Sequence, residues 1–143
     1  RKQFKNFDPV KVAKMTAEDV ERLLQDAGII RHRGKIEATI NNAKRTIEVQ
    51  KEFGSLAAYI WAFEPKPVAV PSGGSSLPAQ TEASVALSKD LRKRGFKFVG
   101  PTTCYAFMQA MGLVNDHYSH CDCRGQCEAE RKALKRPTRK GTA

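Results

Sequence analysis

Histidine and cysteine side chains gather in one short segment near the C-terminal end of the chain. Three of the four cysteines lie between positions 121 and 127, and two of the three histidines precede them, at positions 117 and 120. Thiolate and imidazole are the ligands that zinc prefers. The segment predicts either a closed zinc site or half of one that distant residues complete, with free surface cysteines as the alternative without metal. The closed site would use His117, Cys121, Cys123 and Cys127, and the half-site would use His117 and Cys121.

A second group of residues surrounds a turn between two expected helices. The segment 91–112 reads as a helix, a glycine, a short apolar hairpin at 96–100 and a second helix that begins at Pro101. Amide groups at a helix N-terminus lack internal partners and carry partial positive charge, so they can bind a phosphate. Gly100 has no Cβ, which lets a phosphate approach the main chain. The residues expected to bind a DNA backbone are Lys97, Gly100, Thr102 and Thr103; an ordinary helical hairpin with a glycine turn is the alternative.

The charge of the chain indicates an anionic partner. The 143 residues include 25 Lys and Arg against 15 Asp and Glu, a net charge of +10, and nucleic acid is the usual partner of so basic a chain. Five cations lie within nine residues before and within the turn: Lys89, Arg92, Lys93, Arg94 and Lys97. Residues 124–143 are also basic and contain few apolar side chains, which predicts a disordered tail. No apolar run is long enough to span a membrane, and the composition excludes collagen-like and disulfide-scaffold proteins.

Helical patterns dominate the rest of the chain, so we expect an all-α protein. The longest helix is expected from about residue 31 to residue 53, ended by Gly54. Residues 64–80 contain four of the seven prolines and are expected to form a mobile loop. Helix starts are predicted at Asp8-Pro9, Thr16, Ser55, Thr81 and Pro101. The apolar side chains expected in the core near the turn are Val85, Leu87, Leu91, Cys104, Phe107, Met108 and Met111.

Three stretches around the turn resemble the family of type I DNA-3-methyladenine glycosylases: Leu91–Thr102, Tyr105–Ala110 and Gly112–His117. The resemblance extends from Arg1 to about Cys123, which would make 1–123 the C-terminal part of a helix-hairpin-helix glycosylase domain with its hairpin element at about 84–112. It implies excision of 3-methyladenine from alkylated double-stranded DNA by hydrolysis of the N-glycosidic bond. It also implies a structural zinc ion, of which His117 and Cys121 would be half the ligands.

The same resemblance places the base-recognising glutamate and the aromatic pocket in a preceding half of the domain. We therefore expect no catalytic residue in this chain, which starts at Arg1 without Met, and we expect the chain alone to be inactive. Asp116 is the one weak catalytic candidate, although a role in orienting the turn before His117 is the preferred interpretation. The faces carrying Ile36, Ile40, Ile47, Tyr59 and Trp61 are expected to be left exposed, which would favour association.

Other expectations concern the whole protein. The full enzyme is expected to be a monomer without membrane contact, located in the bacterial cytoplasm and associated with the nucleoid through DNA. Two other classes of function fit the residues. The first is a non-enzymatic helix-hairpin-helix module that binds DNA, and the second is a zinc-stabilised interaction domain with an incidental basic surface. Binding to DNA that falls steeply with salt distinguishes the module from the interaction domain.

Overall fold

The computed structural model describes residues 1–66 and 76–139, and in these residues all regular structure is helical. The expected all-α class is therefore confirmed. A 3₁₀ helix, η1, covers Lys2–Phe7. The α-helices are α1 (Pro9–Ala13), α2 (Ala17–Leu24), α3 (Arg33–Phe53), α4 (Leu56–Trp61), α5 (Glu82–Lys93), α6 (Pro101–Ala110) and α7 (Cys123–Ala133). None of the helices in this described part is long and apolar enough to cross a lipid bilayer.

The helix starts lie where the capping residues predict them. The Asp8 carboxylate accepts hydrogen bonds from the amides of Val10 and Lys11, which supplies partners for the first turn of α1. Thr16 and Asp19 form a reciprocal capping box at the start of α2. At the other end of α3, Gly54 takes φ 85°, a conformation that glycine adopts without steric cost, and the helix stops there.

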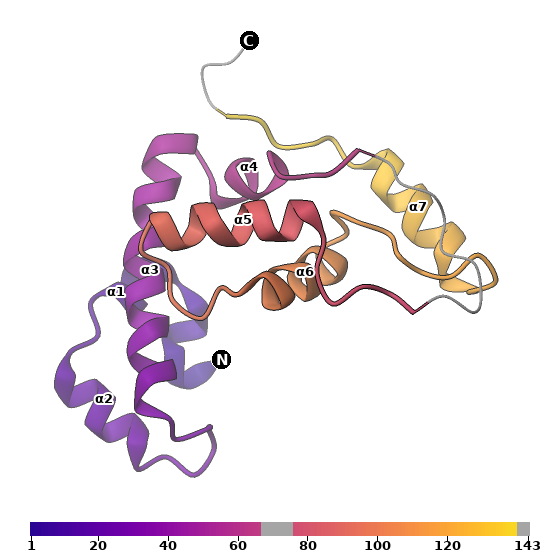
Figure 1. Ribbon diagram of the computed structural model, residues 1–143. Helices are drawn as coiled ribbons and strands as arrows, with labels where there is room; N and C mark the ends of the chain where they lie inside the picture. Colours follow the sequence, from indigo (N-terminus) through magenta and orange to yellow (C-terminus); the bar gives the residue numbers. More distant parts are fainter. Residues whose placement is uncertain (67–75, 140–143) are drawn as a thin grey trace.

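The long helix α3 joins two hydrophobic clusters (Figure 1). Helices α1 and α2 pack beside the N-terminal half of α3, and α4, α5 and α6 extend from its other half. The first cluster contains Val12, Met15, Val20, Leu23, Ile36, Ile40 and Ala43. The second contains Val49, Tyr59, Ile60, Leu87, Leu91, Phe96, Cys104, Met108 and Leu113. We call these the α1–α2 cluster and the α5–α6 cluster.

The structure corrects several expectations about burial. Ile36, Ile40 and Tyr59 are buried rather than exposed, because the two clusters already cover them. Phe107 and Met111 are 41% and 57% exposed, because α6 packs on α5 through the neighbouring stripe that holds Cys104 and Met108. Val85 is also exposed, since α5 turns Ser84, Leu87, Ser88 and Leu91 inward instead.

The basic tail differs most from its prediction. Residues 123–133 form α7, and its Arg131 lies in ion pairs with Glu64 and Glu128. Composition indicates disorder when a segment has too few apolar side chains to bury, but here charged side chains anchor the helix. The expected loop 64–80 has no helix in its described parts, 64–66 and 76–80, and its residues 67–75 lie outside the described residues.

Candidate nucleic-acid interface and metal-binding pair

The turn between α5 and α6, residues 94–100, begins with a glycine stop. Gly95 takes φ 84°, and its amide donates to the Arg92 carbonyl at 2.9 Å. The amide of Phe96 donates back to the Leu91 carbonyl at 3.0 Å, and its side chain is buried. This is the Schellman arrangement, in which an apolar residue after the glycine packs against the helix it ends. The turn therefore leaves α5 in a defined direction.

Side chains of α3 and α5 hold the same turn from the inside. Asn41 donates to the Gly95 carbonyl at 2.8 Å. Asn42 forms two hydrogen bonds with the main chain of Lys97, receiving from its amide at 2.8 Å and donating to its carbonyl at 2.9 Å. The Ser88 hydroxyl donates to the Val99 carbonyl at 2.6 Å. These contacts satisfy main-chain groups that a loop would otherwise leave to water, and they fix the entry into α6.

The N-terminus of α6 is open to solvent. Gly100 is its N-cap and offers no side-chain cap, Pro101 occupies the first helical position, and Thr102 and Thr103 are exposed. Gly100 has an ordinary φ of −63°, and a Cβ built on it would meet nothing nearer than the Arg92 guanidinium, at 3.8 Å. Neither the backbone conformation nor internal packing requires glycine at this position. Close approach of a ligand to the main chain would explain why glycine occupies position 100.

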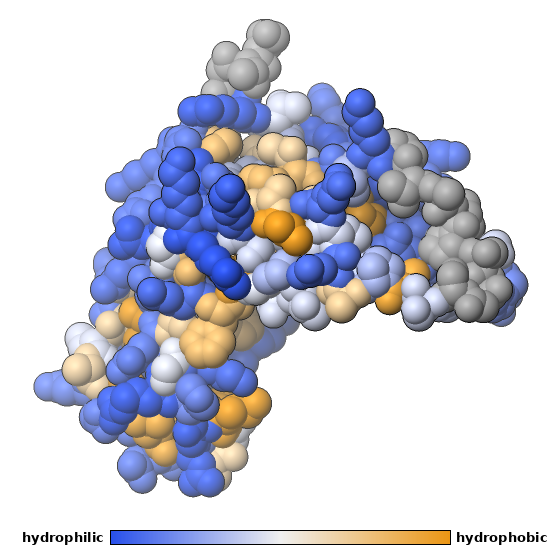
Figure 2. Space-filling model, viewed as in Figure 1, coloured by the Kyte–Doolittle hydropathy of each residue, from blue (hydrophilic) through white to orange (hydrophobic). Residues whose placement is uncertain are grey.

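The five cations before and within the turn have different roles. Arg94 is neutralised by Glu52 and Asp90, each at 2.7 Å, and its guanidinium lies over the rings of Phe53 and Tyr59. The hydrogen bonds to these two carboxylates raise the pKa of Arg94 further. Lys89, Arg92, Lys93 and Lys97 are exposed and have no ion-pair partner within the described residues. Hydrophilic side chains accordingly cover much of the C-terminal half of α5 (Figure 2).

Arg92 is the residue that sequence reasoning missed at this site. It belongs to the basic cluster in the sequence, but only the fold places its guanidinium beside Gly100, at 3.8 Å from the position of a Cβ there. The sequence offers only a weak indication of this contact. Arg92 is eight residues before Gly100, and a short connection brings the last turn of α5 close to the first turn of α6.

The two residues of the expected half-site lie together. His117 Nδ1 and Cys121 Sγ are 3.4 Å apart, in the loop between α6 and α7. Zinc bonds of about 2.0 Å to nitrogen and about 2.3 Å to sulfur, at a tetrahedral angle, separate two such ligand atoms by about 3.5 Å. The pair therefore fits zinc. In the described part of the chain, no group of three or more His, Cys, Asp or Glu side chains is placed to hold a metal ion.

Asp116 lies next to this pair and not at the turn. Its carboxylate accepts a 2.5 Å hydrogen bond from the hydroxyl of Tyr105, a buried residue of α6. Burial, reinforced by this hydrogen bond, raises the pKa of Tyr105 well above its usual value. Asp116, His117 and Cys121 line one cavity of about 580 Å³. Asp116 thus connects α6 to the loop that carries the pair.

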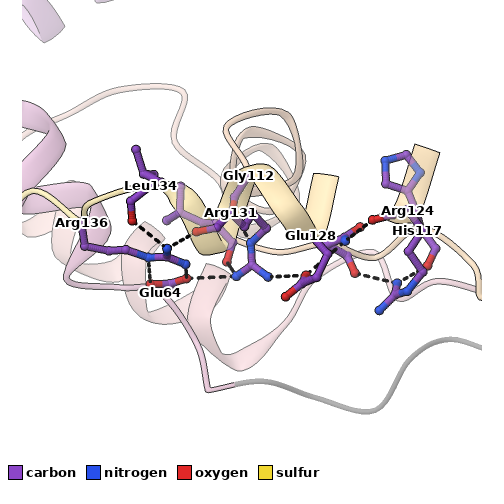
Figure 3. Close-up of polar contacts among 10 residues, drawn as sticks. Glu64, Gly112, His117, Arg124, Glu128, Arg131, Leu134 and Arg136 are labelled. Carbon is purple, nitrogen blue, oxygen red and sulfur yellow. Dashed lines mark hydrogen bonds and ion pairs between the residues drawn. The ribbon is translucent and has the colours of Figure 1, made fainter. Parts of the chain in front are cut away.

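Charged side chains of α7 and the segment after it fasten the same loop from the other side (Figure 3). Arg124 donates to the carbonyls of Asn115 and His117. Arg131 donates to the carbonyls of Gly112 and Leu113, at 2.7 and 3.0 Å. Arg131 and Arg136 also converge on Glu64, and the hydrogen bond from Arg136 is the main cause that lowers the pKa of this carboxyl group. These arginines are therefore occupied within the protein.

Fold and site together define an all-helical protein with an exposed, cationic helix–turn–helix surface and a separate His–Cys pair. The Methyladenine glycosylase family matches residues 1–125, and the chain belongs to this family.

Individual relatives agree with the family match. The chain is 55% identical to DNA-3-methyladenine glycosylase 1 of Escherichia coli K12 over 123 residues, which are 84% of this chain and 65% of the relative. It is 50% identical to DNA-3-methyladenine glycosylase of Haemophilus influenzae over 127 residues, 87% of this chain and 68% of that relative. The chain thus spans about two thirds of the length of these proteins.

Solved structures share the fold. A crystal structure of 3-methyladenine DNA glycosylase I has a TM-score of 0.78 and 51% identity, and the match covers 86% of this chain and 69% of that one. The crystal structure of a variant of such an enzyme in complex with 3-methyladenine has a TM-score of 0.80 and 35% identity, and covers 86% of this chain and 67% of that one.

Proposed function

We propose that this chain is the DNA-backbone-binding part of a base-excision repair enzyme. The enzyme would hydrolyse the N-glycosidic bond of 3-methyladenine in alkylated double-stranded DNA after flipping the nucleotide out of the helix. The observation that carries the proposal is the open N-terminus of α6 at Gly100, next to exposed cations, in a chain of the methyladenine glycosylase family. We also propose the bacterial cytoplasm as the location of the enzyme, because the DNA on which it would act lies in the nucleoid.

The turn acts on the backbone of one DNA strand. Main-chain amides of the first turn of α6 and the hydroxyls of Thr102 and Thr103 donate hydrogen bonds to a phosphate, and Lys97 and Arg92 add positive charge. A contact of this kind reads no sequence. It holds the strand in place while the damaged nucleotide rotates out of the stack. The methylated base is cationic and is therefore a good leaving group. The enzyme has mainly to hold the DNA strand, bind the flipped base and admit a water molecule.

Base recognition is proposed to lie outside these residues. The base-recognising glutamate and pocket aromatics that the family resemblance implies map onto no position of this sequence. The isolated 143-residue chain should therefore bind DNA without releasing a base. Asp116 is proposed as a positioning residue, because its carboxylate receives the hydrogen bond from Tyr105 and adjoins His117.

We further propose that His117 and Cys121 supply half the ligands of a structural zinc ion. The metal would cross-link this loop to two further ligands through bonds that need no hydrophobic core. The loop is prepared for this role, because Arg124 holds the His117 carbonyl while the imidazole faces Cys121.

A salt titration of DNA binding tests the proposal. We consider binding of the chain to a duplex that contains 3-methyladenine. The logarithm of the association constant should fall linearly with the logarithm of salt concentration, with a slope of about −2 to −4 for a few phosphate contacts. Gly100→Ala should reduce affinity by about tenfold or more, because the added methyl group keeps the phosphate from charge-assisted hydrogen bonds with the main chain.

The same variant carries its own control. An alanine fits φ −63° and meets only ordinary contacts, so the melting temperature should stay equal or rise slightly. Failure of the wild-type chain to bind the duplex at low salt would refute the DNA-backbone assignment and favour the interaction-domain alternative. A Gly100→Ala variant that binds as tightly as wild type would place the phosphate elsewhere.

A further inference from the structure

We propose that Phe98 is a DNA-binding residue that packs its ring against the sugar and base edge of the strand whose phosphate lies at Gly100. The inference deepens the proposed function and rests on it. It adds an apolar contact to a site that otherwise consists of charges and main-chain amides. Phe98 is two residues before Gly100, within the α5–α6 turn.

The backbone of Phe98 is in a conformation that aromatic residues avoid. Its φ is 55°, in the left-handed region, where a Cβ crowds the main chain and where glycine is favoured. Such strain persists only where surrounding contacts determine the conformation, and it concentrates at functional positions. The hydrogen bonds from Asn42 to Lys97 and from Ser88 to Val99 are those contacts, since they fix the residues on both sides of Phe98.

The internal packing of the protein does not account for the ring. Phe98 is 58% exposed. One edge meets the imidazole of His32, with the ring centroids 6.4 Å apart, and its tip lies 4.0 Å from the position of a Cβ on Gly34. The fold thus holds a large apolar ring in solvent, in a strained conformation, in the turn that carries the exposed Lys97.

The chemistry of the neighbours identifies the partner. Lys97 precedes Phe98, and the guanidinium of Arg92 lies beside Gly100, so phosphate contacts are available next to the ring. A nucleic-acid strand alternates anionic phosphates with apolar sugar and base surfaces, and proteins meet these with cations and aromatic rings respectively. Neither an acidic peptide nor a free phosphate needs an aromatic ring at this position.

Replacement of Phe98 by glycine tests the proposal, because glycine accepts the left-handed conformation and removes only the ring. The F98G variant should retain its melting temperature. It should bind the same duplex about tenfold more weakly at every salt concentration, with the salt slope unchanged, since no charge is lost. Lys97→Ala should instead make the slope shallower by about one.

Phe7 provides a matched control. It also has a positive φ, 61°, and is 56% exposed. It borders Thr39, Ala43 and Thr46 of α3, whereas Phe98 borders Gly34, Glu37 and Ala38, and at 100° per residue these are opposite faces of the helix. F7G should therefore leave DNA affinity unchanged.

The outcomes separate the inference from the proposed function. Absence of DNA binding by the wild-type chain would reject both. Wild-type binding with equally tight binding by F98G would reject the role of Phe98 and leave the phosphate site intact. Equal weakening by F7G and F98G would also reject it, because the effect would not be local. Should F98G lower the melting temperature, Phe98→Asn, which tolerates the same φ, replaces it in the comparison.

Discussion

At the scale of single residues, two glycines of one turn are present for different reasons. Gly95 has φ 84°, so an L-residue there would be strained whatever the available space. Gly100 has φ −63° and open space around it, so the fold alone would accept alanine. The requirement at Gly95 comes from the chain itself, and the requirement at Gly100 comes from an external ligand under the proposed function.

The metal-binding pair makes a prediction at the same scale. Cys121→Ser should weaken zinc binding by at least about tenfold. Loss of a group that only hydrogen-bonds to a metal ligand already lowers metal affinity by about tenfold or more, and loss of a thiolate ligand itself should cost more. Cys123→Ser is the control and should leave affinity unchanged, since Cys123 is exposed, whereas Cys121 contacts the imidazole of His117. Competition with a chromophoric zinc chelator measures both. Equal losses in the two variants would support the closed site instead.

At the scale of elements, α7 is attached by charges rather than by a hydrophobic face. No residue of α7 is buried. Arg131 reaches two carbonyls of the segment after α6 and the carboxylate of Glu64, which follows α4. An isolated helix of this length is marginal in water, so its order depends on these few contacts. This explains why a pattern of apolar residues could not reveal it.

Arg131→Met should release α7 from the rest of the protein. The variant loses hydrogen bonds to Gly112 and Leu113 together with the ion pair to Glu64, and we expect a local loss of about 2 kcal/mol. Hydrogen exchange should become faster throughout α7 and stay unchanged in α3. Lys132→Met makes the same replacement at an exposed neighbour and should change neither. Protection of α7 that survives R131M would contradict this account.

The same attachment should depend on pH. The pKa of Glu64 is lowered from 4.5 in the folded protein, mainly by the hydrogen bond from Arg136. A carboxyl group with a lowered folded-state pKa contributes stability above its unfolded pKa, and this contribution is lost as the pH falls through the folded value. Exchange protection in α7 should therefore be constant from neutral pH down to about 5 and should decline below about 4.

At the scale of the whole molecule, the two hydrophobic clusters support different parts of the protein. The α5–α6 cluster includes Phe96 of the turn, whereas the α1–α2 cluster includes no residue of the turn and joins α1 and α2 to the N-terminal half of α3. Leu87 and Leu23 are fully buried in the respective clusters. Helix α3 contributes side chains to both clusters and also supplies Asn41 and Asn42 to the turn.

Leu87→Ala and Leu23→Ala should each cost about 2 to 5 kcal/mol of unfolding free energy, as buried leucines do. At a temperature well below both unfolding transitions, L87A should reduce DNA affinity, because it loosens the packing of α5 against α6. L23A should leave the affinity at the wild-type value. Urea titration measures the stability and fluorescence anisotropy with a labelled duplex measures the binding. A larger loss of binding in L23A than in L87A would show that the division is wrong.

Features that depend on near neighbours in the chain could be predicted from the amino-acid sequence. The ends of several helices lie as predicted: the caps Thr16 and Thr81, the stops at Gly54 and Gly95, and the start of α6 at Pro101. The interactions that define these ends involve residues only a few positions apart in the chain. The His117–Cys121 pair belongs to the same group, since four residues separate them.

Tertiary structure alone decided which of these groups are available to a partner. Arg94, Arg131 and Arg136 are as basic in the sequence as Arg92, but carboxylates up to 72 residues away along the chain occupy them. The exposure of Phe98 and the burial of Tyr59 likewise depend on which helices meet. Charge and hydrophobicity are properties of a residue, whereas ion pairing and burial are properties of pairs that only the folded chain brings together.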